Sequence, residues 1–156
     1  IPYDPQKRQV LIYAGSQILP RYLQLLFRGP GSLPVLVVGQ SSFAGARRVQ
    51  RLAPDAFRRE LARSRYFFTY YGQSLFESLS IAGLCPVLYS IGSPYHDFLS
   101  TSIARQLHIP FLRTVQDAIR WQSQLPLRRT RVLATGRGYE LLIGRIKRLL
   151  SADEPV

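Results

Sequence analysis

Two titratable side chains, His96 and Asp97, stand next to each other just after a well-defined helix start. Ser93 is a preferred N-cap residue and Pro94 suits the first helical position, so both side chains are expected in the first turn. There they could contact a sugar or tune a proton transfer, which makes them the catalytic candidates of this sequence. A solvated surface pair explains the same residues equally well, and the sequence leaves both interpretations open.

A second polar segment, Tyr71-Gly72-Gln73-Ser74, lies just before Glu77. Its backbone N–H groups could hold a diphosphate at a helix N-terminus. Glu77 could then accept hydrogen bonds from both ribose hydroxyls, because a carboxylate offers acceptors to two donors. Ser74 and Glu77 also have the Ser-x-x-Glu spacing of a capping box, in which Glu77 reaches back to the backbone of the first turn. The residues alone leave the ligand role and the capping role open.

A third segment, Gly15-Ser16-Gln17, joins an apolar run to a stretch of helical periodicity. Glycine lets a phosphate approach the backbone, and the helix that follows offers free N–H groups. Gly15 and Ser16 are therefore candidates for phosphate contact. An ordinary tight turn between a strand and a helix is the alternative.

Several other kinds of chemistry lack their residue patterns in this sequence. No nucleophile–base triad is evident. Cys85, His96 and His108 are widely separated and do not have the spacing of zinc ligands. Neither a Walker A sequence nor a Gly-x-Gly-x-x-Gly fingerprint occurs. We therefore expect no metal and no cofactor, and a substrate as the only small ligand.

The candidate residues are separated by alternating strand and helix patterns. The expected strands are 10–14, 35–38, 66–70, 86–91 and 110–112, and the expected helices are 18–26, 54–65, 74–82, 94–107, 114–122 and 138–150, with 128–134 as a basic loop or a last edge strand. Apolar strands and connections of helix length favour a doubly wound, mostly parallel α/β sheet of Rossmann-like type. Ligands of such sheets bind outside the carboxyl ends of the strands, where all three polar segments belong.

The composition fits a folded domain with a strongly basic surface. The chain has 156 residues, 46% of them hydrophobic, and a formal charge of +12 from 19 arginines and two lysines against nine acidic residues. Such a charge attracts phosphates, nucleic acid or anionic lipid. Genomic base composition explains an arginine-rich, lysine-poor chain equally well. If the charge is functional, we expect the contacts to be Arg47-Arg48-x-x-Arg51, Arg58-Arg59 and Arg128-Arg129-x-Arg131.

The chain is expected to be one domain and a fragment or processed product of something longer, because it contains no methionine. We assign residues 1–8 to the end of a linker, 9–151 to the domain and 152–156 to a tail. No signal peptide is visible, and no apolar run reaches the about 18 residues that span a bilayer. A single cysteine, Cys85, fits a reducing compartment, and we expect a cytoplasmic location, with peripheral contact at the inner membrane face as an extension.

The order of the elements resembles the C-terminal domain of the PseG/SpsG-like nucleotide-sugar enzymes and, beyond them, MurG and the wider GT-B superfamily. Four segments are similar to the family pattern: the strand and turn 10–16, the strand, turn and Glu-bearing helix 66–86, the helix 93–107, and the segment 134–144 that opens the last helix. The departures are Tyr71 in place of a glycine, Tyr95-His96-Asp97 in place of an Asn-Gln or Asp-Gln pair, and Thr135 in place of an aspartate.

The resemblance implies a role for each candidate. Gly15 and Ser16 would line the phosphate side, Gly72, Gln73 and Ser74 would grip the diphosphate, and Glu77 would bind the ribose. Tyr71 would stack on the ligand or obstruct it, and Ser93 would open the helix near the sugar.

For the whole chain, the resemblance implies the nucleotide-sugar-binding half of a GT-B glycosyltransferase or UDP-sugar hydrolase. Its substrate would be a UDP-type sugar. An N-terminal acceptor domain or a separate partner chain would complete the reaction, and the chain alone would be inactive. The alternative is a degenerate, non-catalytic GT-B-like scaffold that docks an acidic protein, a membrane surface or nucleic acid through its arginines. Nucleic acid is the partner that we expect least, because no interleaved stacking pattern is evident.

Overall fold

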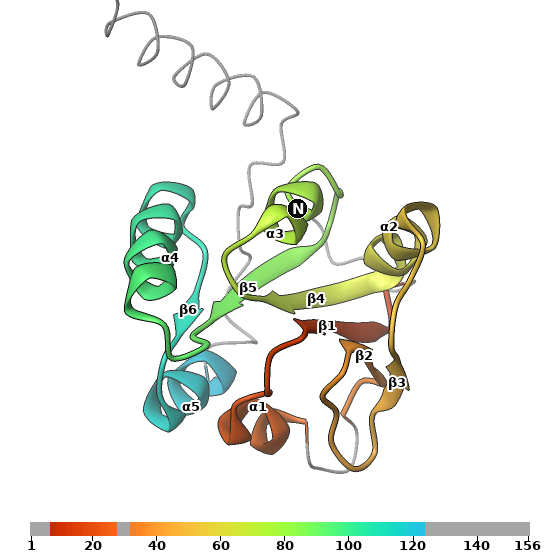
Figure 1. Cartoon of the computed structure of the whole chain (residues 1–156), viewed down its shortest axis with the longest axis horizontal. Helices are drawn as coiled ribbons and strands as arrows, with labels where there is room; N and C mark the ends of the chain where they lie inside the picture. Colours follow the sequence, from red (N-terminus) through yellow and green to blue (C-terminus); the bar gives the residue numbers. More distant parts are fainter. Residues whose placement is uncertain (1–6, 28–31, 124–156) are drawn as a thin grey trace, which may run out of the picture.

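Six parallel strands form a single sheet in the computed structural model, which describes residues 7–27 and 32–123 (Figure 1). The strand order is β3-β2-β1-β4-β5-β6. The strands are β1 (Gln9–Gly15), β2 (Val35–Gly39), β3 (Arg47–Val49), β4 (Ser64–Thr69), β5 (Cys85–Tyr89) and β6 (Phe111–Leu112). The expected doubly wound, mostly parallel α/β sheet is confirmed, and every strand pairing in the described residues is parallel.

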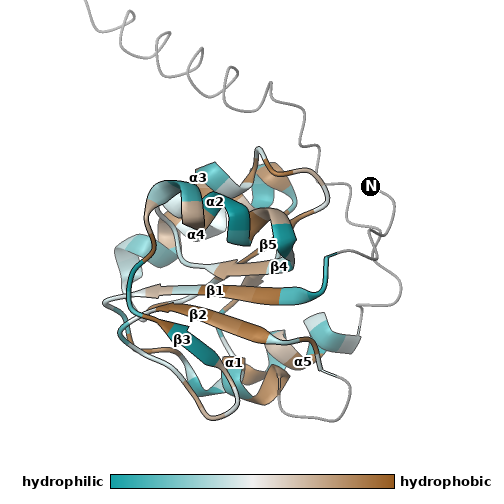
Figure 2. Cartoon of the chain, turned by 90° about the vertical axis from the view of Figure 1, so that its right-hand side faces the viewer, coloured by the Kyte–Doolittle hydropathy of each residue, from teal (hydrophilic) through white to brown (hydrophobic). Residues whose placement is uncertain are grey.

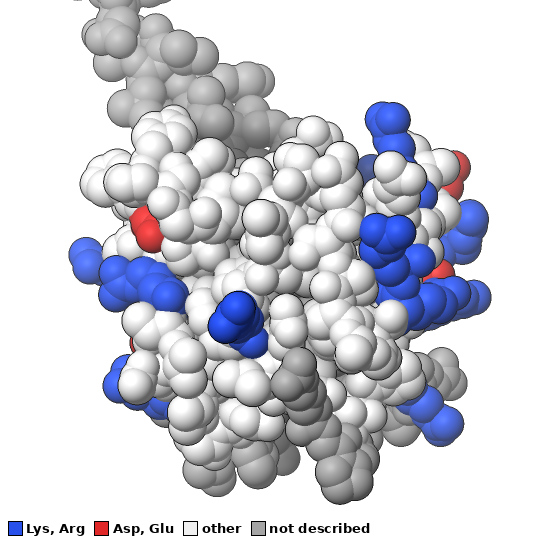
Figure 3. Space-filling view, turned by 60° about the horizontal axis from the view of Figure 1, so that its bottom comes forward, with Lys and Arg blue, Asp and Glu red and all other residues white. Residues whose placement is uncertain are grey.

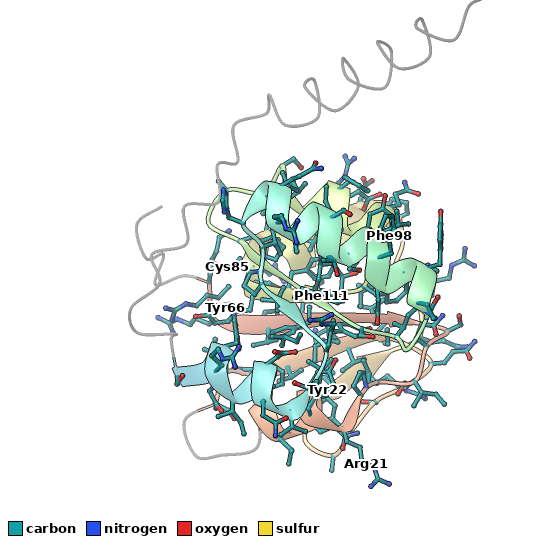
Figure 4. All side chains as sticks on the ribbon, turned by 90° about the vertical axis from the view of Figure 1, so that its left-hand side faces the viewer. Arg21, Tyr22, Tyr66, Cys85, Phe98 and Phe111 are labelled. Atoms are coloured by element: carbon teal, nitrogen blue, oxygen red, sulfur yellow. The ribbon has the colours of Figure 1, made fainter. Side chains whose placement is uncertain are left out.

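Helices cover both faces of the sheet (Figure 1). α1 (Arg21–Leu26) and α5 (Val115–Ser123) lie side by side on one face, whereas α2 (Pro54–Arg63), α3 (Gln73–Ser78) and α4 (Pro94–Leu107) cover the other. Tyr22 lies between α1 and the sheet, whereas its neighbour Arg21 points away from the domain (Figure 4). The described helices include none with the length and apolar character needed to span a bilayer.

The central strand β1 is buried because both of its faces are covered. Val10 and Ile12 pack with α1 and α5, and Leu11 between them packs with the α2 side. Leu11 is in register with Leu36 of β2 and Phe67 of β4, so large apolar side chains stack across the sheet. Figure 2 shows β1 and β2 mostly in brown and the edge strand β3 in teal.

Successive strands are added towards one edge of the sheet from β1 to β3 and towards the opposite edge from β4 to β6. From β1 the chain passes through α1 to β2 and then to the β3 edge. From β4 it passes through α3 to β5 and onward to β6 at the opposite edge. The carboxyl ends of β1 and β4 therefore flank the topological switch point, where sheets of this kind bind ligands.

Three local expectations need correction. β3 was not predicted, because its residues are exposed arginines and it has only the one neighbour β2; such charges also discourage pairing with another chain. α1 begins at Arg21 rather than Ile18, with extended Pro20 as its N-cap. α3 ends at Ser78 rather than Ala82. The expected elements 128–134 and 138–150, the tail 152–156 and the family-like segment 134–144 lie outside the described residues.

Candidate functional site

The turn after β1 is tightly packed against two neighbouring segments. Gly15 has a φ of +55°, and a Cβ built on it would lie 2.7 Å from the Tyr70 hydroxyl. A Cβ on Gly39, at the end of β2, would lie 2.6 Å from the Gly15 nitrogen. Gln40 N also donates to the Gly15 carbonyl at 2.8 Å. Both glycines are therefore needed for close packing at this edge, and the space beside Gly15 is already taken by a tyrosine.

Three tyrosines fill the carboxyl end of the sheet between β1 and β5. The Tyr70 ring lies 5.8 Å from the ring of Tyr13 and 6.0 Å from that of Tyr89, centroid to centroid. The Tyr89 hydroxyl donates to the Tyr13 carbonyl at 2.7 Å. Burial raises the pKa of both Tyr70 and Tyr89 above the ordinary value, so these hydroxyls stay neutral at physiological pH.

The start of α3 is open by comparison. Gly72 is the N-cap residue, and apart from its chain neighbours no atom of the described residues lies within 4 Å of the position that a Cβ on it would take. Leu75 N bonds back to the Gly72 carbonyl at 3.1 Å and closes the first turn. A small anionic group could therefore approach the backbone here, and phosphate contact by Gly72 and Gln73 stays a prediction.

The expected capping box between Ser74 and Glu77 does not form. The Ser74 hydroxyl instead lies 2.9 Å from that of Thr69, and Gln73 Nε2 donates to Glu77 Oε1 at 3.2 Å. The physical reason is that the helix begins at Gln73, so Ser74 lies inside the first turn rather than at its cap. Glu77 remains half-buried and is held by one neutral donor, which leaves acceptor capacity on its carboxylate.

Tyr71 packs on α3. Its ring makes an edge-to-face contact with Phe76, with centroids 5.9 Å apart, and it borders the apolar cluster of Leu75 and Leu88. The Tyr71 side chain thus packs against α3, the helix that follows it in the chain.

The start of α4 confirms the expected Ser93 cap. The Ser93 hydroxyl accepts from His96 N at 3.5 Å and lies 3.2 Å from His96 Nδ1. Asp97 Oδ2 accepts from the Ser90 hydroxyl at 2.9 Å, while its Oδ1 is buried and has no hydrogen-bond partner among the described residues. His96 therefore contacts Ser93, and Asp97 accepts a hydrogen bond from Ser90, near the end of β5. The two side chains are thus not a freely solvated pair.

The two open segments lie at adjacent strand ends. Thr69 of β4 is in register with Leu88 of β5, so Gly72 and Ser90 follow neighbouring strands at the same edge of the sheet. Gly15 and Ser16 follow β1 on the other side of β4, where Ser16 is exposed. The sheet therefore brings the predicted site residues to one edge, on both sides of the tyrosine cluster.

Sequence reasoning missed Thr69, Tyr70 and Ser90. Thr69 ends β4, and Tyr70 and Ser90 stand directly after β4 and β5. The predicted strands 66–70 and 86–91 extend past these ends, and a strand end is the signal that could have identified the three residues. The tyrosine contact with Gly15 additionally depends on how β1 and β4 pair, which the sequence pattern does not specify.

Arginines gather on a different part of the molecule, the β3 edge and α2. Arg47, Arg51, Arg58 and Arg59 are exposed there and form no ion pair within the described residues. Figure 3 shows basic side chains crowded on that side of the domain. The third predicted group, at 128–131, lies outside the described part of the chain.

The described residues hold no recognisable metal site, and the chain matches no known family. Across residues 7–27 and 32–123, no group of three or more His, Cys, Asp and Glu side chains could hold a metal ion. A comparison with models of protein families matched none of them, and a comparison with curated proteins gave no match either.

Proposed function

We propose that this chain is the nucleotide-sugar-binding half of a GT-B glycosyltransferase or UDP-sugar hydrolase. The observation that carries the proposal is the open helix entrance at Gly72, which lies beside the switch point of a parallel sheet with the strand order 3-2-1-4-5-6. The pyrophosphate would lie over Gly72, Gln73 and Ser74, whose backbone N–H groups are the natural donors.

The half-buried carboxylate of Glu77 is suited to bind the nucleoside part of the substrate. It lies in the same helix as this entrance, and Gln73 is its only hydrogen-bond donor among the described residues, so it could accept from the ribose hydroxyls. Ser93 and the side chains of His96 and Asp97 follow the adjacent strand and would lie on the sugar side. Gly15 and Ser16 would contribute less than the resemblance implies, because the Tyr70 hydroxyl occupies the space beside Gly15.

Isothermal titration of UDP into the purified chain tests the proposal. Replacing Glu77 with Gln should weaken UDP binding by about 1–3 kcal/mol, the value of a hydrogen bond to a charged group. Asp55→Asn is the matched control, because it removes one exposed carboxylate from α2, far along the chain from the entrance. Equal UDP affinity in the parent chain and the Glu77→Gln variant, or no UDP binding at all, would contradict the proposal.

A second candidate function is supported by the arginine cluster at β3 and α2. Four exposed arginines without an ion pair in the described residues would attract an anionic macromolecule. Binding of vesicles containing phosphatidylserine, or of a DNA duplex, should then fall at least about tenfold between 50 and 200 mM salt. Arg58→Ser with Arg59→Ser should abolish this binding, whereas Arg105→Ser with Arg120→Ser, which removes the same charge from α4 and α5, should preserve it.

A further inference from the structure

Large apolar side chains are exposed on the outer side of α1 and α5. Among the described residues, six large apolar side chains are exposed, and three of them lie on α1 and α5. These three are Leu25 at 53% exposure, Val115 at 42% and Ile119 at 59%, and they define the α1–α5 apolar surface.

The helix geometry explains why these side chains remain uncovered. Val115 and Ile119 are four residues apart and share one side of α5, while Ala118 and Trp121 face the core. Leu25 extends outward from α1, and Tyr22, Leu23 and Leu26 face inward. Each helix thus has apolar residues on two sides, which is unusual for a surface that faces water only.

Charged side chains border this surface, since Arg21 and Arg120 are exposed on α1 and α5. In Figure 3, most lysine and arginine side chains lie at the two sides of the view and one lies near its centre, and most of the described surface between them is uncharged. α1 and α5 lie on the side of the molecule that this view brings forward.

The chain itself contains a segment of matching chemistry. α5 ends at Ser123, and 33 residues follow it. Within them, apolar residues recur with helical spacing at Tyr139, Leu142, Ile143, Ile146, Leu149 and Leu150. Arg145 and Arg148 fall on the other side of such a helix, together with Leu141, and Lys147 falls at the border of the stripe. This pattern predicts an amphipathic helix with an apolar stripe and a basic side.

We propose that residues 139–150 dock as an amphipathic helix on the α1–α5 apolar surface of their own chain. The 15 residues between Ser123 and Tyr139 could extend about 50 Å, which is ample to reach a surface that begins at α5 itself. Docking within one chain is favoured over docking between copies, because a short tether gives an effective concentration of the order of millimolar. The basic side of the segment would then remain in water.

A spin label on the full chain tests the proposal. In a Cys85→Ser background, Lys147→Cys places a nitroxide beside the apolar stripe, and amide NMR signals report which elements it approaches. The signals of α1 and α5 should lose most of their intensity, and those of α2 should keep theirs. Adding Leu142→Asp and Ile146→Asp, or Ile119→Asp on the receiving surface, should restore the α1 and α5 signals.

Matched controls distinguish docking within one chain from docking between copies or at a different surface. Phe98→Asp changes an equally large apolar side chain that is 69% exposed on α4, and it should leave the broadening unchanged. A mixture of spin-labelled chain and isotope-labelled chain without nitroxide should show no broadening. Broadening in that mixture would mean docking between copies, and unaltered α1 and α5 signals in the spin-labelled chain would mean that the segment binds elsewhere, for example on a membrane; either result overturns the proposal.

Discussion

The hydroxyl of Tyr70 lies 2.7 Å from the position that a Cβ on Gly15 would take. This contact links the ends of β1 and β4, and with them the two sides of the switch point. Any side chain at residue 15 must displace the tyrosine, and the φ of +55° strains every residue except glycine.

Gly15→Ala is therefore expected to destabilise the domain by about 2 kcal/mol, from backbone strain together with the clash. The measurement is urea denaturation followed by circular dichroism. Gly45→Ala is the matched control, because Gly45 also has a positive φ, of +88°, but apart from its chain neighbours no atom in residues 7–27 and 32–123 lies within 4 Å of its Cβ position. Tyr70→Phe in the Gly15→Ala background should recover part of the loss. If Gly15→Ala and Gly45→Ala lower the free energy of unfolding equally, the clash with the Tyr70 hydroxyl does not contribute to the loss.

The helix start at Ser93 predicts a second stability change. Its hydroxyl accepts from His96 N and lies near His96 Nδ1, so Ser93→Ala should cost about 1 kcal/mol of stability. Ser102→Ala, in an exposed position within the same helix, should change stability by less than about 0.5 kcal/mol. Equal effects of the two substitutions in denaturant titrations would argue against the cap.

The sequence predicted the fold better than the site, for reasons that particular residues make clear. Apolar runs such as Val35–Val38 identify buried strands, because a strand covered on both faces needs no polar residues. The sequence pattern did not predict β3, since an edge strand with exposed Arg47 and Arg48 lacks an apolar run. The Ser74–Glu77 capping box does not form because α3 begins one residue before Ser74, and the Ser74 hydroxyl contacts that of Thr69 instead. Contacts of this kind depend on strand ends and pairing, which local patterns do not encode.

Alkaline pH should weaken the fold through Tyr22. Burial raises its pKa to about 12, and its hydroxyl donates to the Leu112 carbonyl at 3.0 Å. In the unfolded chain a tyrosine ionises near pH 10, so the stabilisation is complete below pH 10 and is lost as pH rises towards 12. At pH 11 the loss from this residue is roughly 1 kcal/mol.

Tyr22→Phe isolates this contribution, since phenylalanine fills the same space and does not titrate. The variant should be less stable than the parent chain by about 1 kcal/mol at pH 8, where only the hydrogen bond is lost. The difference should shrink or vanish at pH 11. Urea denaturation at both pH values measures it, and a difference that stays constant would show that Tyr22 does not titrate differently in the two states.

The open space at Gly72 makes the binding proposal testable without disturbing the fold. Gly72 has an extended backbone with φ of 168°, which alanine also adopts, and within the described part of the chain its Cβ position is free of contacts beyond its chain neighbours. Gly72→Ala should thus change stability by less than about 1 kcal/mol. Its methyl group would enter the space assigned to the pyrophosphate and should weaken UDP binding about tenfold, or about 1.4 kcal/mol. If calorimetry finds unchanged UDP affinity in a folded Gly72→Ala chain, the nucleotide binds elsewhere. Circular dichroism on the same sample shows whether a loss of affinity follows from a loss of structure.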